Sequence, residues 1–172
     1  LWYSVDVGTV HVIALCSDCD TSPTSYQFNW LKNDLETNVN RQTTPFVIIM
    51  IHVPLYHTNY LHAHQRRRYI RDFEHLFVKH GIDYVFAGHV HAYQRTYPLK
   101  YGIRTTTTQG RTSEMRESSP DIESGLESES KNDNGNSNRL SLNNIDRGAI
   151  HITVGTGGNY EGLTNRWYED VD

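Results

Sequence analysis

The spacing of apolar residues divides the chain into segments with strand-like and helix-like patterns. Short apolar or alternating runs predict strands over residues 2–7, 10–16, 46–51, 83–87 and 148–154. Gly8 and Thr9 separate the first two runs, so we expect these to form a hairpin. Both sets of alternating positions in residues 10–16 are largely apolar, which predicts a strand buried on both faces.

Two further segments place apolar residues at the spacing of an amphipathic helix. The first runs from about residue 26 to residue 38, and the second covers residues 65–80, followed by Gly81 at the position of a C-cap glycine. The apolar face of the second comprises Tyr69, Ile70, Phe73, Leu76 and Phe77. This helix lies between the strands predicted at 46–51 and 83–87, so the three form a β-α-β unit, and the predicted fold class is α/β.

The segment from Gly102 to Arg147 has a different composition from the rest of the chain. It contains no aromatic residue and is rich in threonine, serine, asparagine and acidic residues. Such a segment cannot bury enough apolar surface to offset the entropy of ordering it. We therefore expect a disordered polar insertion over 102–147, which also explains why only 37% of the 172 residues are hydrophobic.

Charge and hydropathy exclude some classes of partner. The net charge of −4 gives no reason to expect a nucleic-acid partner, and no apolar stretch is long enough to span a membrane. No signal peptide opens the chain, but it begins at Leu1 rather than methionine, so we expect a fragment or a processed product. The sequence therefore predicts neither the cellular compartment nor the oligomeric state.

The only cysteines are Cys16 and Cys19. Such a pair could bind a metal or take part in redox chemistry, but a zinc ribbon needs a second pair and a thioredoxin motif opens a helix. Neither context is present, so the favoured interpretation gives the pair no catalytic role.

Histidines follow two of the predicted strands at the point where each ends. His52 comes directly after the run 46–51, and His89 and His91 follow the run 83–87 through Gly88. Imidazole is a common ligand for zinc, iron and manganese. Because ligands of open α/β folds bind at the carboxyl ends of the strands, the sequence predicts a metal site at this edge.

The loop after His52 adds three histidines, His57, His62 and His64, and we favour an active-site loop there over a chance accumulation. His11, by contrast, has no other ligand among its strand neighbours, which indicates a structural role. The glycine-rich loop at 155–159 lacks the lysine of a P-loop and the spacing of a dinucleotide fingerprint.

Five motifs, taken in order, resemble the purple acid phosphatases, dinuclear enzymes of the calcineurin-like metallophosphoesterase superfamily. The most specific is Gly88-His89-Val90-His91-Ala92-Tyr93-Gln94-Arg95-Thr96, and His52-Val53-Pro54-Leu55-Tyr56 resembles the histidine motif that precedes it. The others are Trp2–Asp6, Gln27–Leu31 and Val154–Asn159. The resemblance implies that residues 1–172 are part of a catalytic domain with a four-layer α/β/β/α sandwich.

The resemblance also implies the roles of individual residues. His52 and His89 would bind a divalent metal (Zn, Mn or Fe(II)), His91 would bind Fe(III), and His62 would contact the substrate phosphate and protonate the leaving group. The implied activity is hydrolysis of phosphate monoesters, with a metal-bound hydroxide as nucleophile. The family is usually secreted, vacuolar or lysosomal.

The chain lacks some of the metal-ligand motifs of the family. The family's other ligands come from upstream motifs, among them Gly-Asp-x-x-Tyr and Gly-Asn-His-Glu, and neither is present here. Gln94 also stands where the family more often has glutamate. We therefore expect an incomplete ligand set and no activity in the isolated chain. The alternatives are a related enzyme acting on phosphodiesters or nucleotides, and a non-catalytic fragment.

Overall fold

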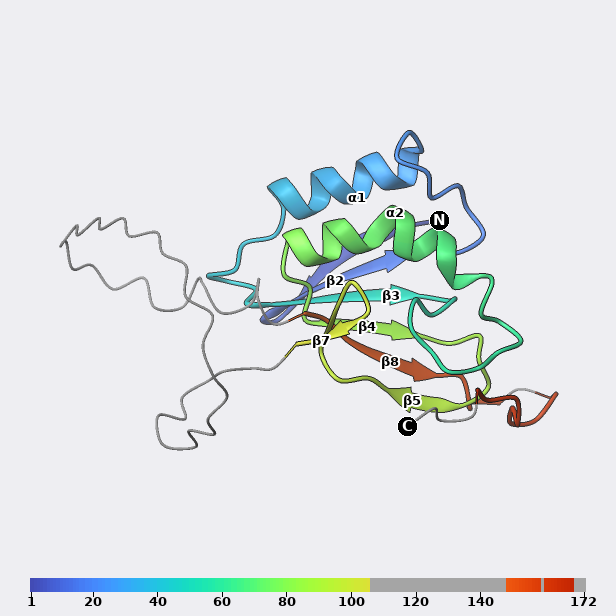
Figure 1. The fold of residues 1–172 in the computed structure, drawn as a ribbon. Coiled ribbons are helices and arrows are strands. Elements are labelled where there is room, and N and C mark those ends of the chain that lie inside the picture. Colours follow the sequence, from blue (N-terminus) through green and yellow to red (C-terminus); the bar gives the residue numbers. More distant parts are fainter. Residues whose placement is uncertain (106–147, 159, 169–172) are drawn as a thin grey trace, which may run out of the picture.

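The computed structural model describes residues 1–105, 148–158 and 160–168, which form one mixed sheet with two helices packed on one of its faces (Figure 1). The six strands of this sheet are β1 (Tyr3–Val7), β2 (Val10–Leu15), β3 (Phe46–Ile51), β4 (Tyr84–Ala87), β5 (Tyr93–Arg95) and β8 (Ile150–Val154). The helices are α1 (Tyr26–Thr37) and α2 (Arg66–Lys79). A two-stranded hairpin of β6 (Leu99–Lys100) and β7 (Ile103–Arg104) lies beside the sheet.

The order of the strands is β1-β2-β3-β4-β8-β5. Strands β2, β3, β4 and β8 run parallel, whereas β1 and β5 are antiparallel strands at the two edges. The β1–β2 hairpin turns at Gly8, whose φ of 59° is readily adopted by glycine. The α/β class, the hairpin and the β-α-β unit predicted from the sequence are confirmed.

Both helices begin and end close to the predicted positions. Ser25 caps α1, because its hydroxyl accepts a hydrogen bond from the Phe28 amide at 3.1 Å. The apolar stripe of α2 packs on the sheet, and Tyr69 and Phe73 are fully buried there. Glycine at position 81 has a φ of 62°, as expected of a residue that ends a helix.

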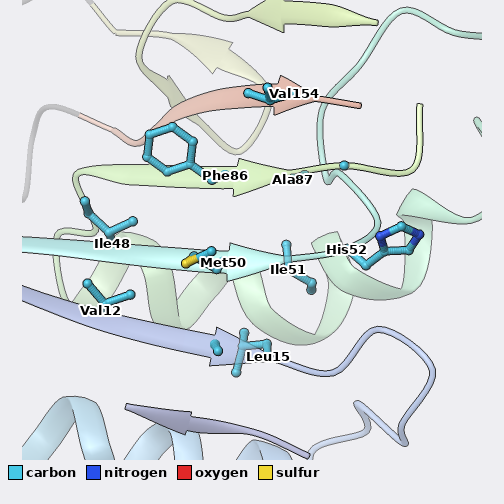
Figure 2. Close-up of a pocket in the computed structure, with 11 residues that line it drawn as sticks. Val12, Leu15, Ile48, Met50, Ile51, His52, Phe86, Ala87 and Val154 are labelled. Atoms are coloured by element: carbon cyan, nitrogen blue, oxygen red, sulfur yellow. The ribbon is translucent and has the colours of Figure 1, made fainter. Parts of the chain in front are cut away.

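The strand expected to be buried on both faces is buried on one only. Ile13 and Leu15 of β2 face the helices and are buried, while Val12 and Ala14 on the opposite face are only partly covered. Apolar residues of β3, β4 and β8 continue this uncovered surface (Figure 2). The prediction was wrong because an apolar strand needs a layer on each side to be buried on both, and the described residues supply one layer.

The structure describes only the first residues of the predicted insertion. Residues 102–105 belong to the β6–β7 hairpin and the chain that follows it, so the boundary expected at residue 102 lies too early. The remainder of the predicted insertion, 106–147, lies outside the described residues. No helix in the described part of the chain is long and apolar enough to cross a membrane.

The histidine in β2 has the structural role expected of it. Its ring lies between two carboxylates, with Nδ1 at 2.5 Å from Asp6 and Nε2 at 3.0 Å from Asp34. Burial opposes the charged form of His11, but the hydrogen bonds to Asp34 and Asp6 outweigh it and raise its pKa above the ordinary value. His11 thus links β1, β2 and α1 through its contacts with Asp6 and Asp34.

Candidate metal centre

Two parallel strands bring the first two candidate ligands together. Ile51 at the end of β3 pairs with Ala87 at the end of β4, so the residues that follow leave the sheet at the same edge. The Gly88 amide donates a hydrogen bond to the His52 carbonyl at 3.0 Å, which extends the pairing by one residue. His52 and His89 therefore face each other beyond the sheet.

The separation of their ring nitrogens suits a single metal ion. His52 Nε2 and His89 Nδ1 are 3.3 Å apart. Two nitrogen ligands at about 2.0–2.1 Å from a tetrahedral metal are themselves about 3.3–3.4 Å apart. The two side chains thus fit one metal held between Nε2 of one ring and Nδ1 of the other.

The backbone of His89, which carries one of these two rings, is in an uncommon conformation. Its φ is 59°, in the left-handed region that costs a non-glycine residue about 1–2 kcal/mol. Close turns hold it there, because the Val90 amide donates to the Gly88 carbonyl at 2.6 Å and the Ala92 amide donates to the Val90 carbonyl at 2.7 Å. Strain of this kind is concentrated at functional sites.

The other two candidates, His62 and His91, lie on the same side of the molecule. The ring centroid of His62 is 4.5 Å from that of His89, edge to face. His62, His89 and His91 line one cleft of about 470 Å³ together with the segment 161–166. Within that segment, Glu161 Oε2 lies 3.5 Å from His91 Nδ1. The structure thus brings together His52, His89, His62 and His91 at one edge of the sheet.

A buried asparagine that no sequence motif singled out connects these loops. The Asn59 amide donates to the Thr164 hydroxyl at 2.7 Å, and its carbonyl oxygen accepts from the His62 amide at 3.3 Å. The Thr164 amide in turn donates to the carbonyl of His91 at 3.0 Å. Asn59 therefore fixes the His62 loop relative to the loop that carries His91.

The electrostatics of the cluster favour neutral imidazole at His89. Burial, followed by the neighbouring His62, His52 and His91, lowers the pKa of its ring below the ordinary value. A neutral ring is the form that binds a metal.

The two remaining histidines of the loop differ from each other. His57 is buried, neither of its ring nitrogens has a hydrogen-bond partner among the described residues, and burial with the nearby Arg66 lowers its pKa to about 4. His64 lines a second cleft beside His52 and Gln65.

The glycine-rich loop after β8 packs directly on the loop that carries the candidate ligands. A Cβ added at Gly155 would lie 1.9 Å from the Val90 carbonyl oxygen, so no larger residue fits without movement. The loop thus closely approaches the chain's own backbone at Val90. Asn159, at the end of the motif, lies outside the described residues.

Two sets of observations limit what the chain can bind by itself. Within residues 1–105, 148–158 and 160–168, no group of three or more His, Cys, Asp or Glu side chains is placed to hold a metal. Cys16 and Cys19 are bonded to each other, so neither is a free thiolate ligand.

Comparison with known proteins agrees with this geometry. Residues 10–93 match the family of calcineurin-like phosphoesterases. Purple acid phosphatase 18 of Arabidopsis thaliana is 34% identical over 167 residues, which are 97% of this chain and 29% of that protein. Phosphoenolpyruvate phosphatase of Allium cepa is 33% identical over 169 residues, 98% of this chain and 29% of that protein.

A solved structure supports the fold. The purple acid phosphatase PPD1 from seeds of yellow lupin (Lupinus luteus) superimposes with a TM-score of 0.68 at 24% identity, over 99% of this chain and 25% of that one. The chain therefore spans less than a third of the length of these relatives. The chain is thus a homologue of part of the purple acid phosphatases, and its residues 10–93 match the calcineurin-like phosphoesterase family.

Proposed function

We propose that this chain is part of an acid phosphatase that hydrolyses phosphate monoesters at a dinuclear metal centre. The single observation that carries the proposal is the pair of facing ring nitrogens of His52 and His89, 3.3 Å apart at the carboxyl edge of β3 and β4. In the proposed site these two residues hold a divalent metal and His91 holds Fe(III). An Arabidopsis thaliana relative named Fe(3+)-Zn(2+) purple acid phosphatase 12, 32% identical over 167 residues, supports this choice of metals.

When bound, two metal ions would neutralise charge on the phosphoryl group and activate a water molecule as the nucleophile. The chain's own residues supply the rest. His62 would contact the phosphate and donate a proton to the leaving group, and its place beside His89 puts an acid within the same cleft. Asn59 would hold His62 there through the hydrogen bond to its amide.

The ligands missing from this chain would come from the rest of a longer parent protein. The uncovered face of the sheet, on the side opposite the helices, is called the open face below. It supports this proposal, because its apolar residues offer a second sheet a surface to pack against. The isolated chain is then expected to hold no stable dinuclear centre and to be inactive. The Cys16–Cys19 disulfide supports a secreted, vacuolar or lysosomal parent, since disulfides persist in oxidising compartments.

The test is an assay of the parent protein with a phosphate monoester and with a phosphodiester. We expect the monoester to be hydrolysed and His89→Ala to abolish turnover together with loss of metal. Hydrolysis of the diester alone would indicate a related phosphodiesterase or nucleotidase instead. Full activity and metal content in His89→Ala would refute the metal site.

A second measurement addresses the isolated chain. Metal analysis of the purified chain is expected to find less than a full pair of ions. Two tightly bound ions per chain would contradict the proposal that this chain contains only one side of the centre.

A further inference from the structure

The residue at the start of α2 is unusual for its position. Gln65 is the N-cap of the helix, where serine, threonine, aspartate or asparagine normally bonds a free backbone amide. The Gln65 side chain makes no such bond. The side chain reaches the ring of His89 instead, with Oε1 at 2.6 Å from Nε2.

This contact determines which nitrogen of the ring carries the proton. A neutral imidazole has one N–H and one bare nitrogen, and a carbonyl oxygen can only accept a hydrogen bond. The amide oxygen of Gln65 therefore keeps the proton on Nε2 of His89, which leaves Nδ1 bare. Nδ1 is the nitrogen that faces His52 Nε2 at 3.3 Å.

We propose that Gln65 is a positioning residue that selects the Nε2–H tautomer of His89 and so presents Nδ1 to the metal. The inference rests on the proposed metal site for its purpose, but the tautomer itself is a property of the metal-free chain. Metal-binding histidines commonly donate their second ring N–H to an oxygen acceptor, and removal of such an acceptor lowers metal affinity by about 10–100-fold.

The backbone and the side chain of His89 act together in this arrangement. The backbone of His89 has a left-handed conformation at φ 59°, and the hydrogen bond to Gln65 holds the ring through Nε2. Gln65 has no competing role in capping, so its substitution leaves the start of α2 with the same backbone partners. An effect of substituting Gln65 on His89 can therefore be distinguished from an effect on the stability of α2.

The test reads the tautomer directly by NMR. Long-range proton–nitrogen correlation spectra of the nitrogen-15-labelled, metal-free chain at about pH 8, where imidazole is neutral, report which ring nitrogen carries hydrogen. We expect His89 to be an Nε2–H tautomer in the wild type and in Gln65→Glu, which keeps an oxygen acceptor. In Gln65→Leu, of similar size without an acceptor, we expect a mixture with substantial Nδ1–H. The His89→Ala spectrum identifies the signals.

Two results would overturn the inference. One is a wild-type His89 with hydrogen on Nδ1, which would mean that the Gln65 amide group donates rather than accepts. The other is an unchanged tautomer in Gln65→Leu with unchanged helix content by circular dichroism, which would show that the hydrogen bond does not set it.

Zinc titration by calorimetry separates this inference from the proposed function. If the wild type binds Zn²⁺, we expect Gln65→Leu to bind about 10–100-fold more weakly and Gln65→Glu to retain affinity. Equal affinity in all three would refute the role of Gln65 toward the metal. Failure of the wild type to bind Zn²⁺ would count against a site in this chain alone, while the spectra would still decide the tautomer.

Discussion

The two faces of the sheet are built from alternate residues of the same strands, yet they meet very different surroundings. On the covered face, Ile13, Val47 and Ile49 are 0% exposed beneath the helices. On the other face, Met50 and Val154 are each 51% exposed. Figure 2 shows that the side chains on this face are nonetheless apolar. A face that met only water would carry polar residues, so this one is suited to a second layer.

The contrast separates two properties that strand sequences combine. Alternation along a strand sets which residues share a face, whereas burial depends on what packs there. In this chain both faces have the composition of a core, but only the helix-covered face has the packing of one. Changes on the two faces should therefore differ in their cost.

The largest difference should come from removing a phenylalanine from each side. Phe73 of α2 is fully buried against the covered face, and Phe73→Ala should lower the free energy of unfolding by about 3–5 kcal/mol. The matched change on the open face, Phe86→Ala, should cost less than about 1 kcal/mol, because Phe86 has no opposing layer. Urea unfolding of both variants measures the two values. Equal costs would show that the open face is packed in solution.

The second prediction concerns a histidine on the covered face. His151 pairs with the buried Val85, its Nδ1 has no partner among the described residues, and burial lowers its pKa to about 3 from 6.5. The unfolded chain therefore binds a proton that the folded chain does not between pH 6.5 and 3, so stability falls as the pH drops through this window. From about pH 8 to about pH 5 the loss should be about 2 kcal/mol.

His151→Phe provides the control for this pH dependence. The variant should lose about 2 kcal/mol less than the wild type over the same range, because the other titrating groups are unchanged. His11 acts in the opposite sense, since its raised pKa stabilises the fold in acid and that contribution disappears as the pH rises through its folded pKa. Identical pH profiles for wild type and His151→Phe would refute the buried neutral ring.

The third prediction applies the comparison to the loops at the carboxyl edge. Gly155→Ala places a methyl group 1.9 Å from the Val90 carbonyl and should cost about 1–2 kcal/mol. Gly157→Ala is the matched control, because a Cβ there meets nothing within 4 Å. Thermal unfolding compares the stabilities, and the His52 and His89 ring signals report any displacement of the pair. Equal stability of both variants would show that the loop gives way freely.

The smallest effect should follow from a charge on the open face. Met50→Lys should change the free energy of unfolding by less than about 0.5 kcal/mol, because a lysine there extends into water. It should also reduce binding of the dye ANS, which reports exposed apolar surface. Ile49→Lys, one residue earlier on the covered face, should prevent folding. A large loss of stability in Met50→Lys would show that the open face is covered.

The sequence predicted most of what local pattern determines. The helices, the β1–β2 hairpin and the β-α-β unit follow from apolar spacing and from the glycines at 8 and 81. The convergence of His52 and His89 followed from two parallel strand ends. The assignment of His52, His89 and His91 as metal ligands and of His62 as the acid stays a prediction.

Features that depend on distant partners could not be predicted. β5 has three residues, and β6 and β7 have two each. Strands this short cannot show an alternation of apolar and polar residues. The exposure of the open face could not be predicted either. Apolar residues on both faces of a strand do not reveal whether a second layer packs on each face. Gln65 and Asn59 are single polar residues whose partners lie in other loops, so only the folded chain reveals their roles.

The position of β8 has a consequence for the order in which the chain folds. β8 lies between β4 and β5, so β5 has no partner in the sheet until Ile150–Val154 arrives from much later in the sequence. Closing a loop costs entropy that grows with its length, by about 0.6 kcal/mol for each doubling. The loop with His89 and His91 is anchored on β4 at one end and on β5 at the other. Its final geometry is therefore a late event in folding, and a nascent chain released before residue 150 would lack it.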